Sequence, residues 1–97
     1  VLMHGDKHIS TRQLARDLGM KHIDAADPKQ ANKWTGYLVG GTSPFGTKTV
    51  LPVYVEASIL ALDTIYINGG KRGFLVVMQA ADLQVLQPVA VNVAVDV

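Results

Sequence analysis

The alternation of apolar and polar positions predicts several short strands in the second half of the chain. Val89–Val95 carries valine at every second position, which is typical of a strand with one buried face. Thr64–Asn68 and Phe74–Met78 are two further apolar runs, and a glycine-rich turn that begins at Asn68-Gly69 joins them. Because the connection is a tight turn, we expect these two strands to pair antiparallel.

The first half of the chain has weaker strand signals. Val1–Met3 is predicted to be the end of a strand, and Tyr37–Val39 a short strand of its own. Val50–Val55 is rich in β-branched residues, but Pro52 lies within it. Proline cannot donate to a sheet ladder, so this segment is expected at a sheet edge or a bulge.

Helices are predicted between these strands. Ser10–Gly19 begins with a capping serine and ends in a glycine suited to a left-handed turn. Asp27–Thr35 has a capping aspartate, proline at the first helical position and glycine directly after its end. Ala57–Leu62 is a short helical turn, and Ala80–Gln87 is a helix that Pro88 ends.

This irregular mixture predicts an α+β (mixed α/β) fold. We expect a mixed, largely antiparallel sheet or a partly closed barrel, with helices packed outside. The 97 residues, 48% of them hydrophobic, contain no repeat, low-complexity segment or linker, which indicates one domain or part of one. Because the chain opens inside an apolar run, we interpret residues 1–97 as a single domain whose N-terminal portion is missing.

Composition narrows the possible functions. The net charge is only +1, but no lysine or arginine follows Arg72, so Val1–Gly73 is biased towards basic residues and compatible with an RNA backbone. The absence of cysteine excludes disulfides, a thiolate nucleophile and a cysteine-based metal site. No apolar run approaches the ~18 residues of a membrane-spanning helix, and no signal peptide is recognisable, so a cytoplasmic location is expected.

The glycine-rich segment from Gly40 to Gly46 is the first candidate site. Glycines let backbone amides approach a ligand closely, and several convergent amides can bind an anion or a polarised carbonyl oxygen. A plain turn explains the same residues equally well. A phosphate-binding P-loop is rejected, because Thr47 stands where that motif needs lysine and a β-branched segment follows instead of a helix.

The second candidate is the turn from Asn68 to Gly73, where two adjacent cations could hold a phosphate. An exposed turn with solvated charges is the alternative. No metal site is expected, because a metal needs three or four converging ligands and no third ligand is evident around any of the histidines. Ser43 and Ser58 lie in no nucleophile elbow and no Ser-His-Asp arrangement. The histidines are His4, His8 and His22.

These two motifs together resemble the signatures of the YbaK/ProX-type aminoacyl-tRNA editing domains. Thr35–Gly46 contains the Gly-x-x-x-Pro loop of that family at Gly40 to Pro44, and Ile65–Gly73 is similar to its second signature. The resemblance covers nearly the whole chain and is closest to the YbaK branch, the Cys-tRNA(Pro) deacylases. Asn68 stands where members of that branch commonly have serine.

The resemblance implies removal of a misattached amino acid from tRNA, with cysteine on tRNA(Pro) favoured over alanine or serine. The thiol of the substrate would attack its own ester, and loop amides would stabilise the oxyanion. The implied catalytic positions are Gly40, Gly41, Thr42, Ser43 and Pro44, and the implied substrate-binding positions are Tyr37, Phe45, Gly46, Asn68, Gly69, Gly70, Lys71 and Arg72.

The implied partners are mischarged tRNA and, as a candidate, prolyl-tRNA synthetase; no cofactor, metal, membrane or DNA is implied. The family's key lysine is expected upstream of Val1, so we expect these 97 residues alone to be nearly inactive. Two other functions stay open: a non-catalytic tRNA- or protein-binding module of the same fold, and a small-molecule hydrolase or transferase unrelated to tRNA.

Overall fold

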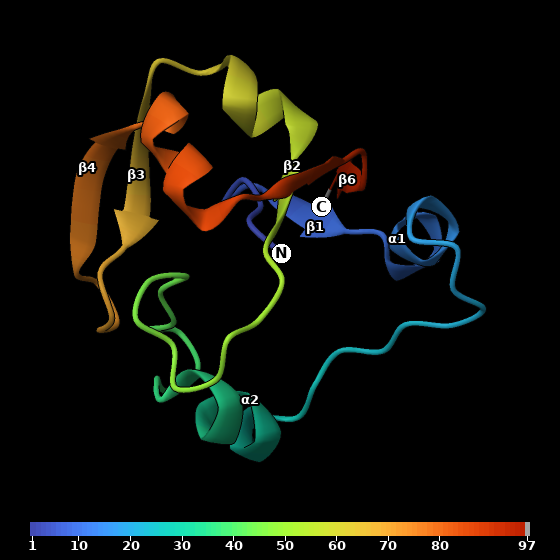
Figure 1. Ribbon diagram of the computed structural model, residues 1–97, viewed down its shortest axis with the longest axis horizontal. Coiled ribbons are helices and arrows are strands. Elements are labelled where there is room, and N and C mark those ends of the chain that lie inside the picture. Colours follow the sequence, from blue (N-terminus) through green and yellow to red (C-terminus); the bar gives the residue numbers. More distant parts are fainter. Residues whose placement is uncertain (97) are drawn as a thin grey trace.

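Short strands and helices alternate along the part of the chain that the computed structural model describes, residues 1–96 (Figure 1). None of the elements is longer than eight residues. In chain order they are β1 (Lys7–Ile9), α1 (Thr11–Asp17), α2 (Pro28–Thr35), β2 (Tyr54–Glu56), the 3-10 helix η1 (Ala57–Ala61), β3 (Thr64–Asn68), β4 (Leu75–Gln79), the 3-10 helix η2 (Ala80–Leu86), β5 (Val89–Val91) and β6 (Ala94–Asp96).

The strands form three separate pairs. β3 and β4 are antiparallel, as the tight turn between them predicts, and so are β1 and β6. β2 and β5 are parallel, and Leu2 adds a single parallel bridge to Val55. The α+β fold is therefore confirmed. The expected continuous sheet is divided into pairs, and over residues 1–96 these pairs do not close into a barrel.

Capping chemistry places the two α-helices as predicted. The Ser10 hydroxyl accepts a hydrogen bond from the Gln13 amide at 3.2 Å, and the Asp27 carboxylate accepts one from the Gln30 amide at 3.0 Å. Gly36 ends α2 in a left-handed conformation with φ of 82°. The predicted helix before Pro88 is present, but as the tighter 3-10 form.

Three strand predictions are wrong, one because the strand is absent and two in extent. Tyr37–Val39 is not a strand, because the Tyr37 amide and carbonyl are bound by Thr35 and Asn32 at the end of α2. Of Val50–Val55, only the last two residues join β2, and Val50 is fully exposed. Val89–Val95 splits into β5 and β6, because the Val93 and Ala94 amides donate to the buried carboxylate of Glu56.

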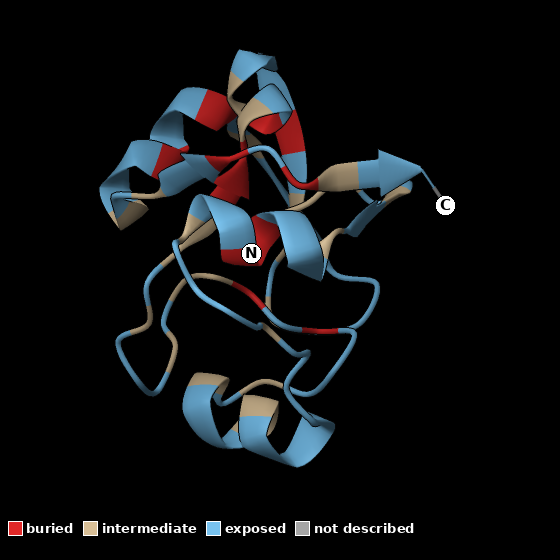
Figure 2. Ribbon diagram, turned by 90° about the vertical axis from the view of Figure 1, so that its right-hand side faces the viewer, coloured by how far each residue is buried: buried red, intermediate tan, exposed pale blue. Residues whose placement is uncertain are grey.

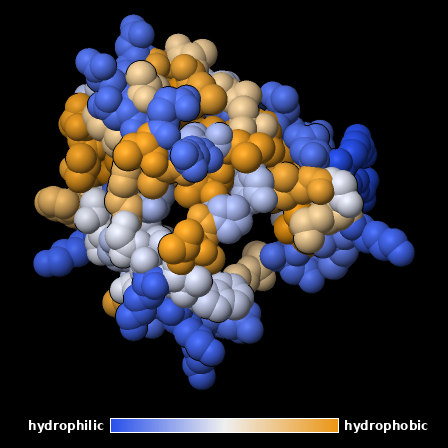
Figure 3. Space-filling view, in the orientation of Figure 1, coloured by the Kyte–Doolittle hydropathy of each residue, from blue (hydrophilic) through white to orange (hydrophobic). Residues whose placement is uncertain are grey.

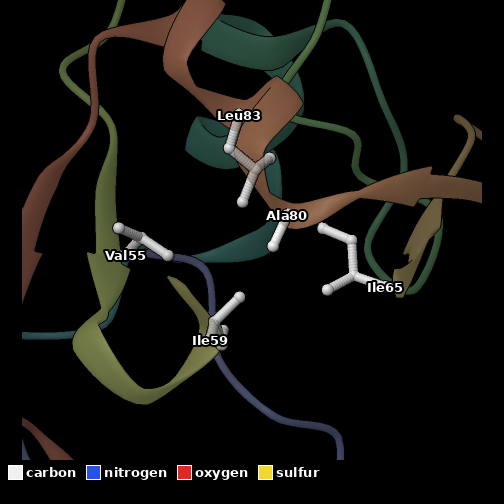
Figure 4. Close-up of a cluster of buried hydrophobic side chains, with 5 residues drawn as sticks. All are labelled: Val55, Ile59, Ile65, Ala80 and Leu83. Atoms are coloured by element: carbon white, nitrogen blue, oxygen red, sulfur yellow. The ribbon is translucent and has the colours of Figure 1, made fainter. Parts of the chain in front are cut away.

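The core lies in the half of the molecule that contains β2, η1, β3 and η2. Its main cluster comprises Val55, Ile59, Ile65, Ala80 and Leu83, whose side chains converge in Figure 4. A second cluster of Leu14, Val91 and Val93 fixes α1 against β5 and β6. α2 buries no residue and lies away from this core (Figure 2). The half that holds α2 is therefore organised by loop contacts and not by a core of its own.

Glu56 is the buried carboxylate that ends β2. One carboxylate oxygen accepts hydrogen bonds from the hydroxyl and amide of Ser58 at 2.5 and 3.0 Å, and the other from the amides of Val93 and Ala94 at 2.9 and 3.2 Å. The two bonds from Ser58, followed by those from the two backbone amides, lower the pKa of Glu56 to about 2 against the opposing effect of burial. Glu56 thus joins the start of η1 to the β5–β6 connection.

Replacing Glu56 with glutamine is expected to destabilise the fold by about 2 kcal/mol at neutral pH, because one pair of donors would then face an amide NH₂ group. The folded-state pKa lies below the ordinary value of 4.5, so the carboxylate stabilises the native state above that pH and stops doing so as the pH falls towards 2. Urea unfolding at pH 7 and pH 3 measures both effects. An equal destabilisation at the two pH values would contradict this account.

Candidate functional site

The two predicted motifs lie against each other at one end of the molecule. We call residues 40–46 the glycine-proline loop and residues 68–73 the basic turn. The Asn68 side-chain amide donates to the Gly40 carbonyl at 3.2 Å and to the Lys71 carbonyl at 3.1 Å. Its oxygen accepts from the Gly70 amide at 2.7 Å. Asn68 therefore shapes the basic turn and fixes it to the loop.

At Gly41 the loop lies against the backbone of the basic turn. A Cβ atom at this position would lie 2.8 Å from the amide nitrogen of Arg72 and 3.0 Å from the carbonyl carbon of Lys71. No side chain fits against backbone at such a distance, because these atoms cannot move independently of the turn. The glycine at position 41 is thus required by packing, and the same residue is buried.

Tyr37 is the second connection between the loop and the turn. Its hydroxyl donates to the Phe45 carbonyl at 2.6 Å, and its ring would lie 2.9 Å from a Cβ placed at Gly70. Phe45 in turn packs its side chain against the main core cluster. Tyr37 and Phe45, which the resemblance places in the substrate site, also anchor the loop to the turn and to the core.

Internal hydrogen bonds decide which loop amides remain for a ligand. The Gly41 amide donates to the Leu38 carbonyl at 2.9 Å, and the Phe45 amide to the Ser43 hydroxyl at 3.2 Å. Within residues 1–96, the amides of Gly40, Thr42, Ser43 and Gly46 donate to no other group. The sequence predicted several inward amides without distinguishing them, and Thr42 and Ser43 are the adjacent pair among those left unpaired.

Side chains of the loop and the turn differ in exposure. Ser43 is buried and Pro44 is partly buried, whereas Thr42 and Gly46 are exposed. Gly69 packs beside the side chains of Phe74 and Val76 in its own hairpin. Lys71 and Arg72 are exposed, and the Arg72 side chain would lie 3.6 Å from a Cβ placed at Gly40. An exposed guanidinium thus lies directly beside the loop.

Sequence reasoning missed a polar chain elsewhere in the fold. His4 Nε2 lies 2.7 Å from the Ser58 hydroxyl, which itself donates to Glu56. Because the serine proton is given to the carboxylate, the histidine is not placed as the base of a Ser-His-Asp nucleophile. A glutamate within the apolar run Val53–Ala57 was the one sequence signal of this arrangement.

Two negative findings apply to the part of the chain that the structure describes. Residues 1–96 contain no cluster of three or more histidine and acidic side chains that could hold a metal ion. No helix among them is long and apolar enough to cross a bilayer. A cavity of about 260 Å³ lies between the N-terminal segment and β3, and neither the glycine-proline loop nor the basic turn lines it.

Solved structures share this fold. One, described as "Crystal structure of a putative trans-editing enzyme for prolyl tRNA synthetase", superposes with a TM-score of 0.85 at 22% identity and covers 96% of this chain and 59% of its own. Another, the hypothetical protein APE2540, has the same TM-score and identity and covers 96% and 62%. At this identity the likeness shows the fold alone, which is α+β.

Sequence comparison identifies the family. The model of the aminoacyl-tRNA editing domain matches residues 1–86, and the chain belongs to this family. The resemblance seen in the two glycine motifs is therefore confirmed.

The chain is also similar to curated proteins that are much longer. One is the Enterococcus faecalis protein named "Putative Cys-tRNA(Pro)/Cys-tRNA(Cys) deacylase EbsC", with 32% identity over 69 residues, which are 71% of this chain and 42% of that protein. Another is the proline–tRNA ligase of Moorella thermoacetica, with 30% identity over 73 residues, which are 75% of this chain and 13% of the ligase. The chain thus spans less than half the length of the curated relatives it matches.

Replacing Gly41 with alanine is expected to separate the glycine-proline loop from the basic turn, because the new methyl group would overlap the Lys71–Arg72 peptide. The free energy of unfolding should fall by about 1–3 kcal/mol in urea titrations. Gly5→Ala is the matched control, since a Cβ there meets nothing within 4 Å and the residue has no positive φ. Equal stability of the two variants would refute the close packing of Gly41.

Replacing Asn68 with aspartate keeps the acceptor for Gly70 but removes the donor to Gly40 and Lys71. The turn should loosen, because a negative charge would face two carbonyl oxygens. Limited trypsin digestion should then cut after Lys71 or Arg72 several times faster. Gln84→Glu makes the same amide-to-carboxylate change at an exposed position, and no acceleration is expected in that variant.

Proposed function

We propose that this protein edits misacylated tRNA by releasing the wrong amino acid from the terminal ribose, with Cys-tRNA(Pro) as the substrate. The contact between the glycine-proline loop and the basic turn carries this proposal, since it puts free backbone amides beside exposed cations. Membership of the editing-domain family and the similarity to a protein named as a Cys-tRNA deacylase support it.

The amides of Thr42 and Ser43 are the proposed oxyanion site. They are adjacent, donate to no other group within residues 1–96, and belong to a loop held by the core through Phe45 and by the turn through Asn68. Such fixed donors stabilise charge that develops on a carbonyl oxygen without needing to reorganise during the reaction. Gly40, Gly41 and Pro44 set the loop's conformation and make its close contacts.

The proposed nucleophile is the substrate's own thiol. Its sulfur attacks the ester carbonyl carbon, the carbonyl oxygen takes up the negative charge, and the ester C–O bond then breaks. The ribose oxygen leaves with the proton that the thiol loses, and the cysteine departs as a four-membered thiolactone. The loop needs to supply positioning and charge stabilisation only, which fits its composition, because Ser43 is buried and its hydroxyl accepts from Phe45.

The basic turn is proposed to hold the tRNA end. Lys71 and Arg72 form no ion pair within residues 1–96, so both charges are available to a phosphate or a ribose. Arg72 lies beside Gly40, which would bring a bound nucleotide next to the loop amides. Two proline–tRNA ligases contain a segment similar to this chain, which supports tRNA(Pro) as the carrier and the ligase as a candidate partner.

The thiol requirement provides the test. The release of amino acid from Cys-tRNA(Pro) is compared with release from S-methylcysteinyl-, alanyl-, seryl- and prolyl-tRNA(Pro) under single-turnover conditions. We expect release only of cysteine, because the methylated sulfur and the other side chains cannot form the thiolactone. Equal release of S-methylcysteine would show that water is the nucleophile and would overturn the proposed mechanism.

The same assay should include a chain extended at its N-terminus to the length of the relatives. We expect the 97 residues alone to turn over far more slowly than the extended chain, since the family's key lysine is expected outside them. Comparable rates would contradict that expectation. Tight binding of tRNA by the extended chain without any release would instead favour a non-catalytic binding module.

A further inference from the structure

Charge is distributed unevenly over this fold. We define residues 27–48 and 68–73 as the basic lobe, which contains α2, the glycine-proline loop and the basic turn. The lobe carries five lysine or arginine residues and one aspartate, a net charge of +4, whereas the other residues sum to −3. The five cations are Lys29, Lys33, Lys48, Lys71 and Arg72. A nearly neutral chain therefore has one strongly positive side.

The basic lobe is continuous in space. The Trp34 and Thr35 carbonyls at the end of α2 accept hydrogen bonds from the Thr49 and Lys48 amides at 2.8 and 3.1 Å. The Lys48 side chain would lie 3.2 Å from a Cβ placed at Gly36. Tyr37 follows directly and reaches the basic turn at Gly70. Contacts thus lead without a break from α2 to the cations of the turn.

In the described part of the chain, the cations of α2 are neither buried nor ion-paired. The helix buries no residue, and Lys29 and Lys33 are both exposed. The ion pairs within residues 1–96 join Lys7 to Asp96 and His22 to Asp24, outside the lobe. Figure 3 shows hydrophilic side chains over the end of the molecule that α2 occupies in Figure 1.

We propose that the exposed side of α2, with Lys29 and Lys33, docks the phosphate backbone of the tRNA acceptor arm. This inference rests on the proposed function, and it adds a binding surface away from the reacting ester. The rest of the chain has a net negative charge and repels RNA, so a duplex whose end lies at the basic turn is drawn along the lobe towards α2. The two lysines, one helical turn apart, lie on the same side of the helix.

The charge of α1 provides a matched control. Arg12 and Arg16 occupy the second and sixth positions of that helix, and Lys29 and Lys33 occupy the second and sixth positions of α2. All four side chains are exposed. Replacing either pair with glutamate changes the net charge by the same amount. In both helices the first glutamate interacts favourably with the helix dipole in the first turn, and the second interacts unfavourably with it in the last turn. The two double variants should therefore have similar thermal stability.

The test uses an acceptor-stem RNA hairpin that carries no amino acid. Its binding to the 97-residue chain is measured by fluorescence anisotropy across a range of KCl concentrations. We expect Lys29→Glu/Lys33→Glu to weaken binding at least about tenfold and to flatten the slope of log K against log [KCl] by about two units. Arg12→Glu/Arg16→Glu should change binding by less than about threefold, because α1 lies outside the lobe.

The other outcomes distinguish failure of the α2 surface from failure of the proposed editing function. Equal effects of the two double variants would overturn the α2 surface while the proposed editing function stands. A loss of affinity with no change in the salt slope would exclude phosphate contacts by these lysines. That result would also overturn the α2 surface alone. If the unaltered chain binds no RNA even at low salt, both the surface and the proposed role on tRNA fail.

Discussion

The arrangement of the candidate site depends on one close contact between two stretches of backbone. Gly41 lies so near the Lys71–Arg72 peptide that no Cβ can stand between them, and Asn68 fixes this separation with bonds to both sides. The glycine-proline loop has no regular secondary structure to hold it, whereas the basic turn ends the β3–β4 hairpin. The contact therefore ties the loop to a hairpin that is itself packed on the core.

The glycine-proline loop also contacts both the core and the end of α2. Phe45 packs against the main core cluster on one side, and Tyr37 follows directly from the C-terminal cap of α2 on the other. α2, which has no core of its own, is thus held through the same residues that set the loop. The charges on α2 and the amides in the loop are therefore linked by one set of contacts, as the proposed binding of an RNA duplex and its reactive end requires.

Local chemistry explains which parts of the fold could be predicted from the sequence. The helices were found because their caps are encoded within a few residues, as at Ser10 and Asp27, and the β3–β4 hairpin because its turn lies between its strands. The division of Val89–Val95 could not be predicted, since it depends on Glu56, 37 residues before Val93. The candidate site shows the same difference between local signals and contacts made only on folding. Its motifs are visible as glycine patterns, whereas the amides left free are decided by bonds that only the folded loop makes.

The single tryptophan gives this protein a built-in optical reporter. Trp34 lies in the last turn of α2, 40% exposed, and its carbonyl holds the segment that follows the glycine-proline loop. Its indole is distant in sequence from every residue of the two core clusters, yet it belongs to the lobe with the net positive charge. Its emission should therefore respond to events at α2 separately from the melting of the core, so that one unlabelled sample can follow both.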